Sequence, residues 1–118
     1  MLYQGSCHCG HIAFEVEGDL HSVKECNCSI CQRLGALRWF VKRAQIKFLT
    51  PESHLSTYQF GKKSIRHHFC AKCGCAPLGA ALYQGVEMAS INVRCLENVD
   101  FSALKIKQVD GRSLPITS

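Results

Sequence analysis

Nine cysteines in a chain of 118 residues constrain this protein more than any other feature of its sequence. Seven form three close clusters and two more follow: Cys7 and Cys9; Cys26, Cys28 and Cys31; Cys70 and Cys73; then Cys75 and Cys95. An odd number cannot pair completely into disulfides, and the first residues lack the basic and apolar stretches of a secretory signal peptide. Cysteines with only one or two residues between them suit a shared metal ion better than a disulfide. The sequence therefore predicts a cytoplasmic protein whose cysteines bind metal.

Length, hydropathy and charge limit the class of protein further. A chain of this length predicts one domain, residues 1–118. No apolar run approaches the ~20 residues that cross a bilayer, so no membrane segment is expected. The formal net charge of +5 hints at an anionic partner, but seven thiolates with two Zn²⁺ ions would lower it to about +2. Because the basic residues are also scattered, we do not expect nucleic acid to be the partner.

Alternating apolar residues predict a mainly β fold. Strands are expected at residues 11–17, 37–41, 46–49, 55–60, 64–69, 88–94 and 104–109. In the first of them, Ile12, Phe14 and Val16 share one face. The fourth and fifth flank a loop with Gly61, which is typical of a hairpin. With one short helix expected at residues 29–34, the prediction is a small β domain whose loops carry the cysteines.

The first and third cysteine clusters together supply four thiolates, the ligand number and type of a closed structural zinc site. We expect the ligands to be Cys7, Cys9, Cys70 and Cys73. The Cys-x-Cys pair is expected in an extended segment, with both side chains on one face, and the Cys-x-x-Cys pair in a tight turn. Gly10 and Gly74 follow these pairs and can adopt the positive φ that turns often need. Structural zinc contributes about 10–16 kcal/mol in small peptides, more than the roughly 4 kcal/mol for closing a loop of about sixty residues.

The middle cluster has three candidate ligands, Cys26, Cys28 and Cys31. Three protein ligands with an open fourth position are typical of a catalytic zinc. The spacing leaves an alternative open, in which Cys75, Cys95 or a histidine completes a second closed site. Cys95 follows an expected strand, so it can equally be a small buried apolar residue.

An open zinc site bound by thiolates has a clear chemical use. Coordination deprotonates a thiol, whose free pKa is roughly 8.5, at neutral pH. A thiolate can attack an aldehyde carbonyl to form a hemithioacetal, or the zinc can activate water or polarise a carbonyl. The sequence has no His-Glu-x-x-His pairing for metal-assisted hydrolysis.

Three stretches around these clusters resemble the glutathione-dependent formaldehyde-activating enzyme family, which includes the centromere protein V branch. They are Gly-Ser-Cys-His-Cys-Gly at residues 5–10, Cys-Asn-Cys-Ser-Ile-Cys at 26–31 and Phe-Cys-Ala-Lys-Cys-Gly at 69–74. Residues 91–94 and 110–112 show a weaker resemblance to the same family. The resemblance implies a β-tent fold, in which several small coiled β-sheets surround zinc-binding loops.

The resemblance also implies two zinc ions and a reaction. One zinc would be structural, on Cys7, Cys9, Cys70 and Cys73. The other would be catalytic or labile, at a reacting centre formed by Cys26, Cys28 and Cys31. The family's named reaction condenses formaldehyde with glutathione to S-hydroxymethylglutathione and is classed among carbon–sulfur lyases. The implied partners are therefore a glutathione-like thiol and an aldehyde.

An anionic thiol such as glutathione needs cations in its binding cleft. Arg33 and Arg38 are nearest in sequence to the middle cluster and are our candidates for binding it, with Arg66 and Arg94 as further ones. The simpler interpretation of each arginine taken singly is an exposed surface charge.

Several other residues invite a functional interpretation beside a simpler one. One of His67 and His68 would face inward from a strand and could donate to a cysteine sulfur, although an exposed or already paired histidine is simpler. His8 is expected to point away from the metal. Trp39 and Phe40 are expected in the core.

Two functions of different classes follow. The first is an enzyme that forms or breaks thiol–aldehyde adducts at a three-cysteine zinc. The alternative is a non-catalytic zinc-binding domain that acts as an interaction module or metal buffer. A second zinc that chelators and small thiols remove readily would favour the enzyme.

Overall fold

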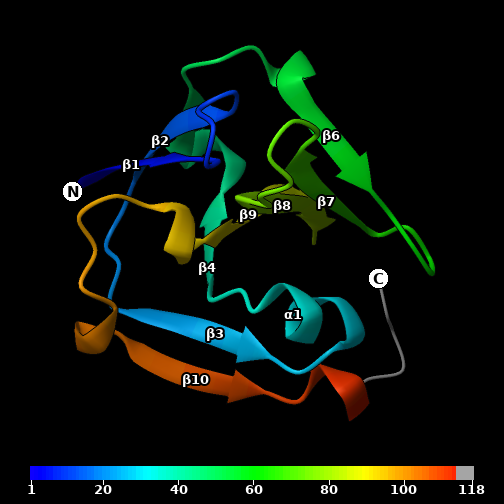
Figure 1. The fold of residues 1–118 in the computed structure, drawn as a ribbon. Coiled ribbons are helices and arrows are strands. Elements are labelled where there is room, and N and C mark those ends of the chain that lie inside the picture. The colour runs from blue at the N-terminus through cyan, green and yellow to red at the C-terminus, as the bar shows by residue number, and fades with distance from the viewer. Residues whose placement is uncertain (114–118) are drawn as a thin grey trace.

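The strands assemble into two sheets (Figure 1). The computed structural model describes residues 1–113, and the last five residues of the predicted domain, 114–118, lie outside the described residues. The smaller sheet is antiparallel, with the order β1-β2-β5. Its strands are β1 (Leu2–Ser6), β2 (Ala13–Glu17) and β5 (Ile46–Phe48).

The larger sheet has the order β10-β3-β4-β9-β8-β7-β6. Every neighbouring pair is antiparallel except β3 and β10, which run parallel and side by side at one end of the sheet (Figure 1). Its strands are β3 (Ser22–Cys26), β4 (Arg38–Lys42), β6 (Leu55–Tyr58), β7 (Ile65–Cys70), β8 (Leu78–Tyr83), β9 (Val86–Asn92) and β10 (Lys105–Val109). The prediction of a mainly β fold of the β-tent type is confirmed.

Helices in the described residues are short. The α-helix α1 (Ser29–Leu34) has the predicted bounds and ends at Gly35, whose φ is 66°. The other helical segments are single 3₁₀ turns: η1 (Arg43–Gln45), η2 (Glu52–His54), η3 (Val93–Cys95), η4 (Phe101–Ala103) and η5 (Gly111–Ser113). Within residues 1–113, no helix has the length and apolar character needed to span a lipid bilayer.

The core lies where alternate residues of the two sheets meet. Phe14 and Val16 of β2 and the preceding Ile12 are fully buried, which confirms the pattern read from the sequence. Burying each large apolar side chain contributes roughly 1.5–3 kcal/mol, so the main hydrophobic cluster, which contains Phe14 and Val16, holds the sheets together. Its members are Phe14, Val16, Leu20, Val23, Leu37, Trp39, Val41, Ile46, Leu78, Ala89, Ile91, Val93 and Leu96.

Strand β4 presents different side chains to its two faces. Trp39 and Val41 enter the core, as expected. The core prediction for Phe40 is wrong: the ring is 50% exposed on the opposite face, with the Lys24 ammonium 5.0 Å from its centroid. The surface interpretation of Arg38 is also wrong, because Arg38 lies on that second face and is only 5% exposed. Successive strand residues point to opposite faces, so the core can take only every second residue of this apolar run.

The predicted hairpin is present, while three strands were not predicted. Strands β6 and β7 pair antiparallel across a loop in which Gly61 has a φ of 59°. Strands β1, β3 and β8 carry weak local signals, and the sequence of β8, Leu-Gly-Ala-Ala-Leu-Tyr, is rich in small residues. These segments are extended because neighbouring strands supply partners for their backbone N–H and C=O groups.

A substitution at Gly5 tests the packing between β1 and the core. A Cβ at this position would lie 2.6 Å from Phe14 Cζ and 2.9 Å from Leu96 Cδ2. Because Phe14 is fully buried, we expect Gly5→Ala to lower the free energy of unfolding by about 1–3 kcal/mol, measured by urea denaturation. The exposed neighbour substitution Gln4→Ala should change it by less than about 0.5 kcal/mol. Equal stability of the two variants would contradict this close packing.

Candidate metal centres

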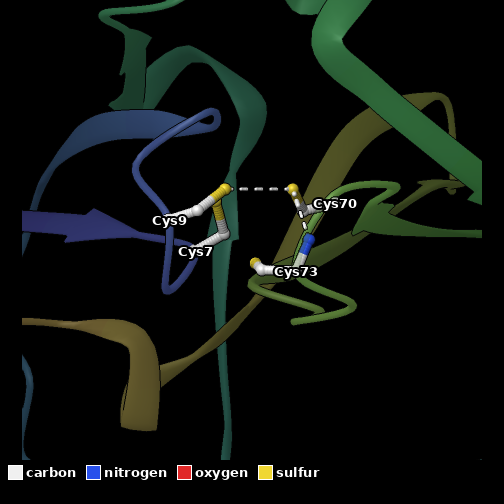
Figure 2. Close-up of side chains that lie close together, drawn as sticks. All are labelled: Cys7, Cys9, Cys70 and Cys73. Carbon is white, nitrogen blue, oxygen red and sulfur yellow. Dashed lines mark hydrogen bonds between the residues drawn. The ribbon is translucent and has the colours of Figure 1, made fainter.

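Four cysteines gather where the two sheets meet. The sulfur atoms of Cys7, Cys9, Cys70 and Cys73 all lie within 4.8 Å of one another, and Figure 2 shows their side chains pointing toward a common centre. The Cys7 and Cys9 sulfurs are 3.7 Å apart, and those of Cys9 and Cys70 are 3.6 Å apart. Four sulfurs in a tetrahedron about 2.3 Å from a zinc ion would be about 3.8 Å apart. The cluster therefore has the size and donor type for a closed zinc site.

The first pair of these cysteines lies in a turn after β1. The Gly10 N–H donates to the Cys7 carbonyl over 3.3 Å, and the Ile12 N–H donates to the Cys7 sulfur over 3.3 Å. Gly10 has a φ of 82°, as predicted. The extended conformation predicted for this pair is wrong. The Cα atoms of residues i and i+2 in a strand are about 6.6 Å apart. The Cys7 and Cys9 sulfurs are only 3.7 Å apart, and the chain bends to bring them together.

The second pair closes a matching turn at the end of β7. The N–H groups of Lys72 and Cys73 both donate to the Cys70 sulfur over 3.4 Å, and the second of these bonds is drawn in Figure 2. The Gly74 N–H donates to the Cys70 carbonyl over 2.8 Å, and Gly74 has a φ of 81°. Both predictions for this pair, the turn and the positive φ, are confirmed.

Backbone N–H groups favour the thiolate forms of Cys70 and Cys73. At Cys9 the His11 N–H lowers the pKa, but burial and the neighbouring thiols outweigh it and raise the pKa to about 11. Donation from the Cys75 N–H, and then from the Cys9 N–H, lowers the pKa of Cys73 to about 5. The N–H of Cys73 lowers the pKa of Cys70 against the opposing effect of burial. Cys7 and Cys70 are 2% and 0% exposed, whereas Cys73 is partly exposed and Cys9 is exposed, so one side of this centre faces solvent. A closed site with four sulfur donors is what a structural ion requires.

The three middle cysteines form a second cluster at the junction of β3 and α1. Cys26 is the last residue of β3, Cys28 is the N-cap of α1 and Cys31 lies in its first turn. Their sulfur atoms also lie within 4.8 Å of one another, and all three residues are partly exposed. Among the described residues, neither Cys75 nor Cys95 belongs to this cluster.

Cys75 and Cys95 lie instead near the four-cysteine cluster. Cys75 packs against the buried group that contains Cys7 and Cys70. Burial raises the pKa of the Cys95 thiol to about 11, with Cys75 as the next cause. Cys95 is half-buried, and its thiol stays protonated at neutral pH.

The thiols of the middle cluster differ in acidity. Burial acts to raise the pKa of Cys28, but donation from the Cys31 N–H and from the neighbouring thiols outweighs it and lowers that pKa. Burial and the hydrogen bond to Cys28 raise the pKa of Cys31 to about 11, against the attraction of the Arg38 charge. The thiolate form is therefore more favoured at Cys28 than at Cys31, and binding an ion would release the protons that the thiols still carry.

A segment from the end of β10 packs against the middle cluster. The Asn27 side chain donates to Asp110 over 2.9 Å and accepts from the Arg112 N–H over 2.9 Å. These bonds hold Gly111 so close that a Cβ there would lie 2.5 Å from the Cys26 sulfur. Residues 110–112 are thus site residues that our candidate list missed, although their resemblance to the family was a signal.

The middle cluster opens into a cavity of about 580 Å³, within the range of ligand sites. No Asp or Glu lines it in the described part of the chain, whereas four cationic side chains do. The lining residues are Lys24, Cys26, Cys28, Ser29, Ile30, Cys31, Arg33, Arg38, Phe40, Phe60, Ile65, His67, Ser90, Val109, Gly111 and Arg112. The field inside favours an anionic ligand.

Two of the four candidate arginines line the cavity and two do not. Arg33, which is exposed, and Arg38, which is buried, both line the cavity with the middle cluster. Arg66 forms an ion pair with Glu87, and neither it nor Arg94 lines that cavity. His67 lies in the cavity wall, with its Nε2 unpaired rather than bonded to a cysteine sulfur.

A substitution at Gly111 tests whether its close approach shapes the middle cluster. We expect Gly111→Ala to weaken zinc binding there by about 10–100-fold, because its Cβ would displace the Cys26 sulfur. Competition with a chromophoric chelator measures the affinity. The thermal midpoint should stay near that of the unaltered protein, since the four-cysteine cluster is intact. Lys107→Ala, on the exposed part of β10, serves as control, and unchanged affinity in Gly111→Ala would contradict the assignment.

Comparison with known proteins agrees with this arrangement. Residues 2–108, which contain all three cysteine clusters, match the family model described as glutathione-dependent formaldehyde-activating enzyme. A crystal structure titled as a Rhodobacter sphaeroides protein is similar with a TM-score of 0.74 and 28% identity, covering 88% of this chain and 99% of that one. The fold, the clusters and the match over most of the chain lead to one conclusion: this protein belongs to the glutathione-dependent formaldehyde-activating enzyme family.

Proposed function

We propose that the protein is a zinc-dependent carbon–sulfur lyase that forms or breaks thiol–aldehyde adducts such as S-hydroxymethylglutathione. The observation that carries this proposal is the partly exposed three-cysteine cluster at a cavity lined by cations and by no carboxylate of the described residues. Nine unpaired cysteines fit a reducing compartment, so we place the activity in the cytoplasm, in one zinc-binding domain over residues 1–118.

Each cluster has its own role in this proposal. Cys7, Cys9, Cys70 and Cys73 would hold the structural zinc. Cys26, Cys28 and Cys31 would hold a second, labile zinc and leave its fourth position open to the cavity. A zinc ion bound there supplies Lewis acidity, which favours the thiolate form of a substrate thiol at neutral pH.

The protein's own side chains would bind and orient the reactants. Arg33 and Arg38 would attract the anionic groups of a glutathione-like thiol. Phe40 and Phe60 would exclude water from the aldehyde. In the reaction, the thiol loses its proton, its sulfur bonds to the carbonyl carbon as the C=O π bond opens, and the carbonyl oxygen takes up one proton in place of the one released, giving the hemithioacetal. The reverse steps release thiol and aldehyde.

Removing a ligand from the four-cysteine cluster should unfold the protein. We expect Cys7→Ser and Cys70→Ser to be insoluble or to lose the cooperative thermal transition, because structural zinc contributes about 10–16 kcal/mol and a domain has about 5–15 kcal/mol in total. Circular dichroism melting and zinc content per chain measure this. Cys95→Ser, which is outside both clusters, is the matched control. Normal melting of either cluster variant would show that its cysteine does not hold a structural ion.

Removing a ligand from the middle cluster should instead abolish activity and spare the fold. We expect Cys28→Ser to keep its thermal midpoint within a few degrees, to lose about one zinc ion per chain and to lose acceleration of adduct formation between glutathione and formaldehyde, followed by NMR. Retained acceleration would move the reacting centre elsewhere. Equal resistance of both zinc ions to chelator, with no activity toward any aldehyde tried, would favour the non-catalytic zinc-binding domain.

A further inference from the structure

Two buried polar atoms in residues 1–113 have no hydrogen-bond partner, and they lie in the same cavity. They are Nη1 of Arg38 and Nε2 of His67. Arg38 is 5% exposed and His67 is 9% exposed. A buried donor without a partner costs free energy, most of all when the group is charged, so such atoms require an explanation. One explanation is a ligand that forms the missing hydrogen bonds with these two atoms.

The sheet places these two atoms in one wall of the cavity. Arg38 begins β4, and His67 lies in the middle of β7. The neighbour of Arg38 along the strand, Trp39, faces the core, and the neighbour of His67, His68, bonds to Thr57 instead. Burial lowers the pKa of His67 and the Arg38 charge adds to this effect, so the imidazole is neutral and can donate its Nε2 proton.

No carboxylate of the described residues lies in the cavity to compensate the Arg38 charge. Phe60 stacks on the His67 ring with 5.6 Å between centroids, and Phe40 and Ile65 supply further apolar lining. Exposed cations, Lys24 and Arg112 among them, complete the lining. The anionic form of a middle-cluster cysteine can compensate part of this charge, and the carboxylate of a ligand would pair with the guanidinium directly. A carboxylate is a small monoanion with two acceptor oxygens, so it suits two unpaired donors in a partly apolar cavity.

We propose that Arg38 and His67 form a carboxylate-binding site in this cavity, which selects a reactant carrying a carboxylate close to the three-cysteine cluster. The identity of that reactant rests on the proposed function, whereas the binding of the carboxylate does not. Either the thiol or the aldehyde can bring the group, and the two sources are distinguished by experiment. Arg38 and His67 are binding residues in this proposal and specify the substrate class.

Binding of a simple carboxylate tests the site without any reaction. We expect propionate to bind the full-length protein at least about 10-fold more tightly than neutral propionamide, measured by calorimetry, and to shift the Arg38 Nε–H and His67 ring NMR signals. Arg38→Gln and His67→Phe should each remove most of this preference, and His67→Phe keeps a ring against Phe60. Lys42→Gln removes a positive charge from the exposed end of the same strand and should leave the preference unchanged.

Three outcomes of this binding experiment would overturn the site: equal binding of propionate and propionamide, a preference that survives Arg38→Gln, or NMR shifts elsewhere in the protein. Melting curves and zinc content accompany every variant. If Arg38→Gln does not fold, Arg38→Lys keeps the charge but not the guanidinium geometry, and it should bind propionate with intermediate affinity. Loss of zinc with an unchanged preference for propionate would assign Arg38 to the metal centre and contradict the proposal.

Reaction assays then show which reactant brings the carboxylate. In one arm, formaldehyde reacts with 3-mercaptopropionate or its amide; in the other, 2-mercaptoethanol reacts with glyoxylate or glycolaldehyde. A rate preference of about 10-fold for the acid, lost in Arg38→Gln, identifies the thiol or the aldehyde as the carrier. Acceleration without preference in both arms overturns the inference and leaves the proposed function standing. Carboxylate binding without acceleration in either arm supports the site and removes the proposed function.

Discussion

The gathering of four cysteine sulfurs between the two sheets is the constraint on which the rest of the structure depends. Cys9 and Cys70 are 61 positions apart in sequence, yet their sulfurs are 3.6 Å apart. The first pair follows β1 of the smaller sheet and the second ends β7 of the larger one, so the cluster ties the sheets together. Thiolates this close repel one another unless a cation lies between them, which couples the fold to metal binding.

The two faces of the larger sheet have separate tasks. One face packs on the smaller sheet through residues such as Trp39 and Ile91. The other bends around the cavity and presents Arg38, Phe40 and His67 to it. The same strands therefore stabilise the protein and shape the site. A cavity built on paired strands is more rigid than one built on loops, which would help to orient two small reactants under the proposed function.

The two cysteine clusters differ in the way a structural and a reactive ion would require. The four-cysteine cluster has a full set of four sulfur donors, two of them buried, while the three-cysteine cluster has three partly exposed donors and opens to the cavity. The match to the family spans both clusters. The cationic lining adds a property of this chain, since it favours anionic reactants over neutral ones.

The sequence by itself determined the grouping of the cysteines, the buried face of β2, and the helix α1. Spacing and alternation are local properties, so they can be read along the chain. Only the tertiary structure decided that the first cysteine pair bends into a turn, that β8 is a strand, and that Gly111 packs on Cys26. It also decided that Arg38 is buried beside a cavity together with His67. Each of these features depends on contacts between segments that are distant in the sequence, and a local sequence pattern does not specify those contacts.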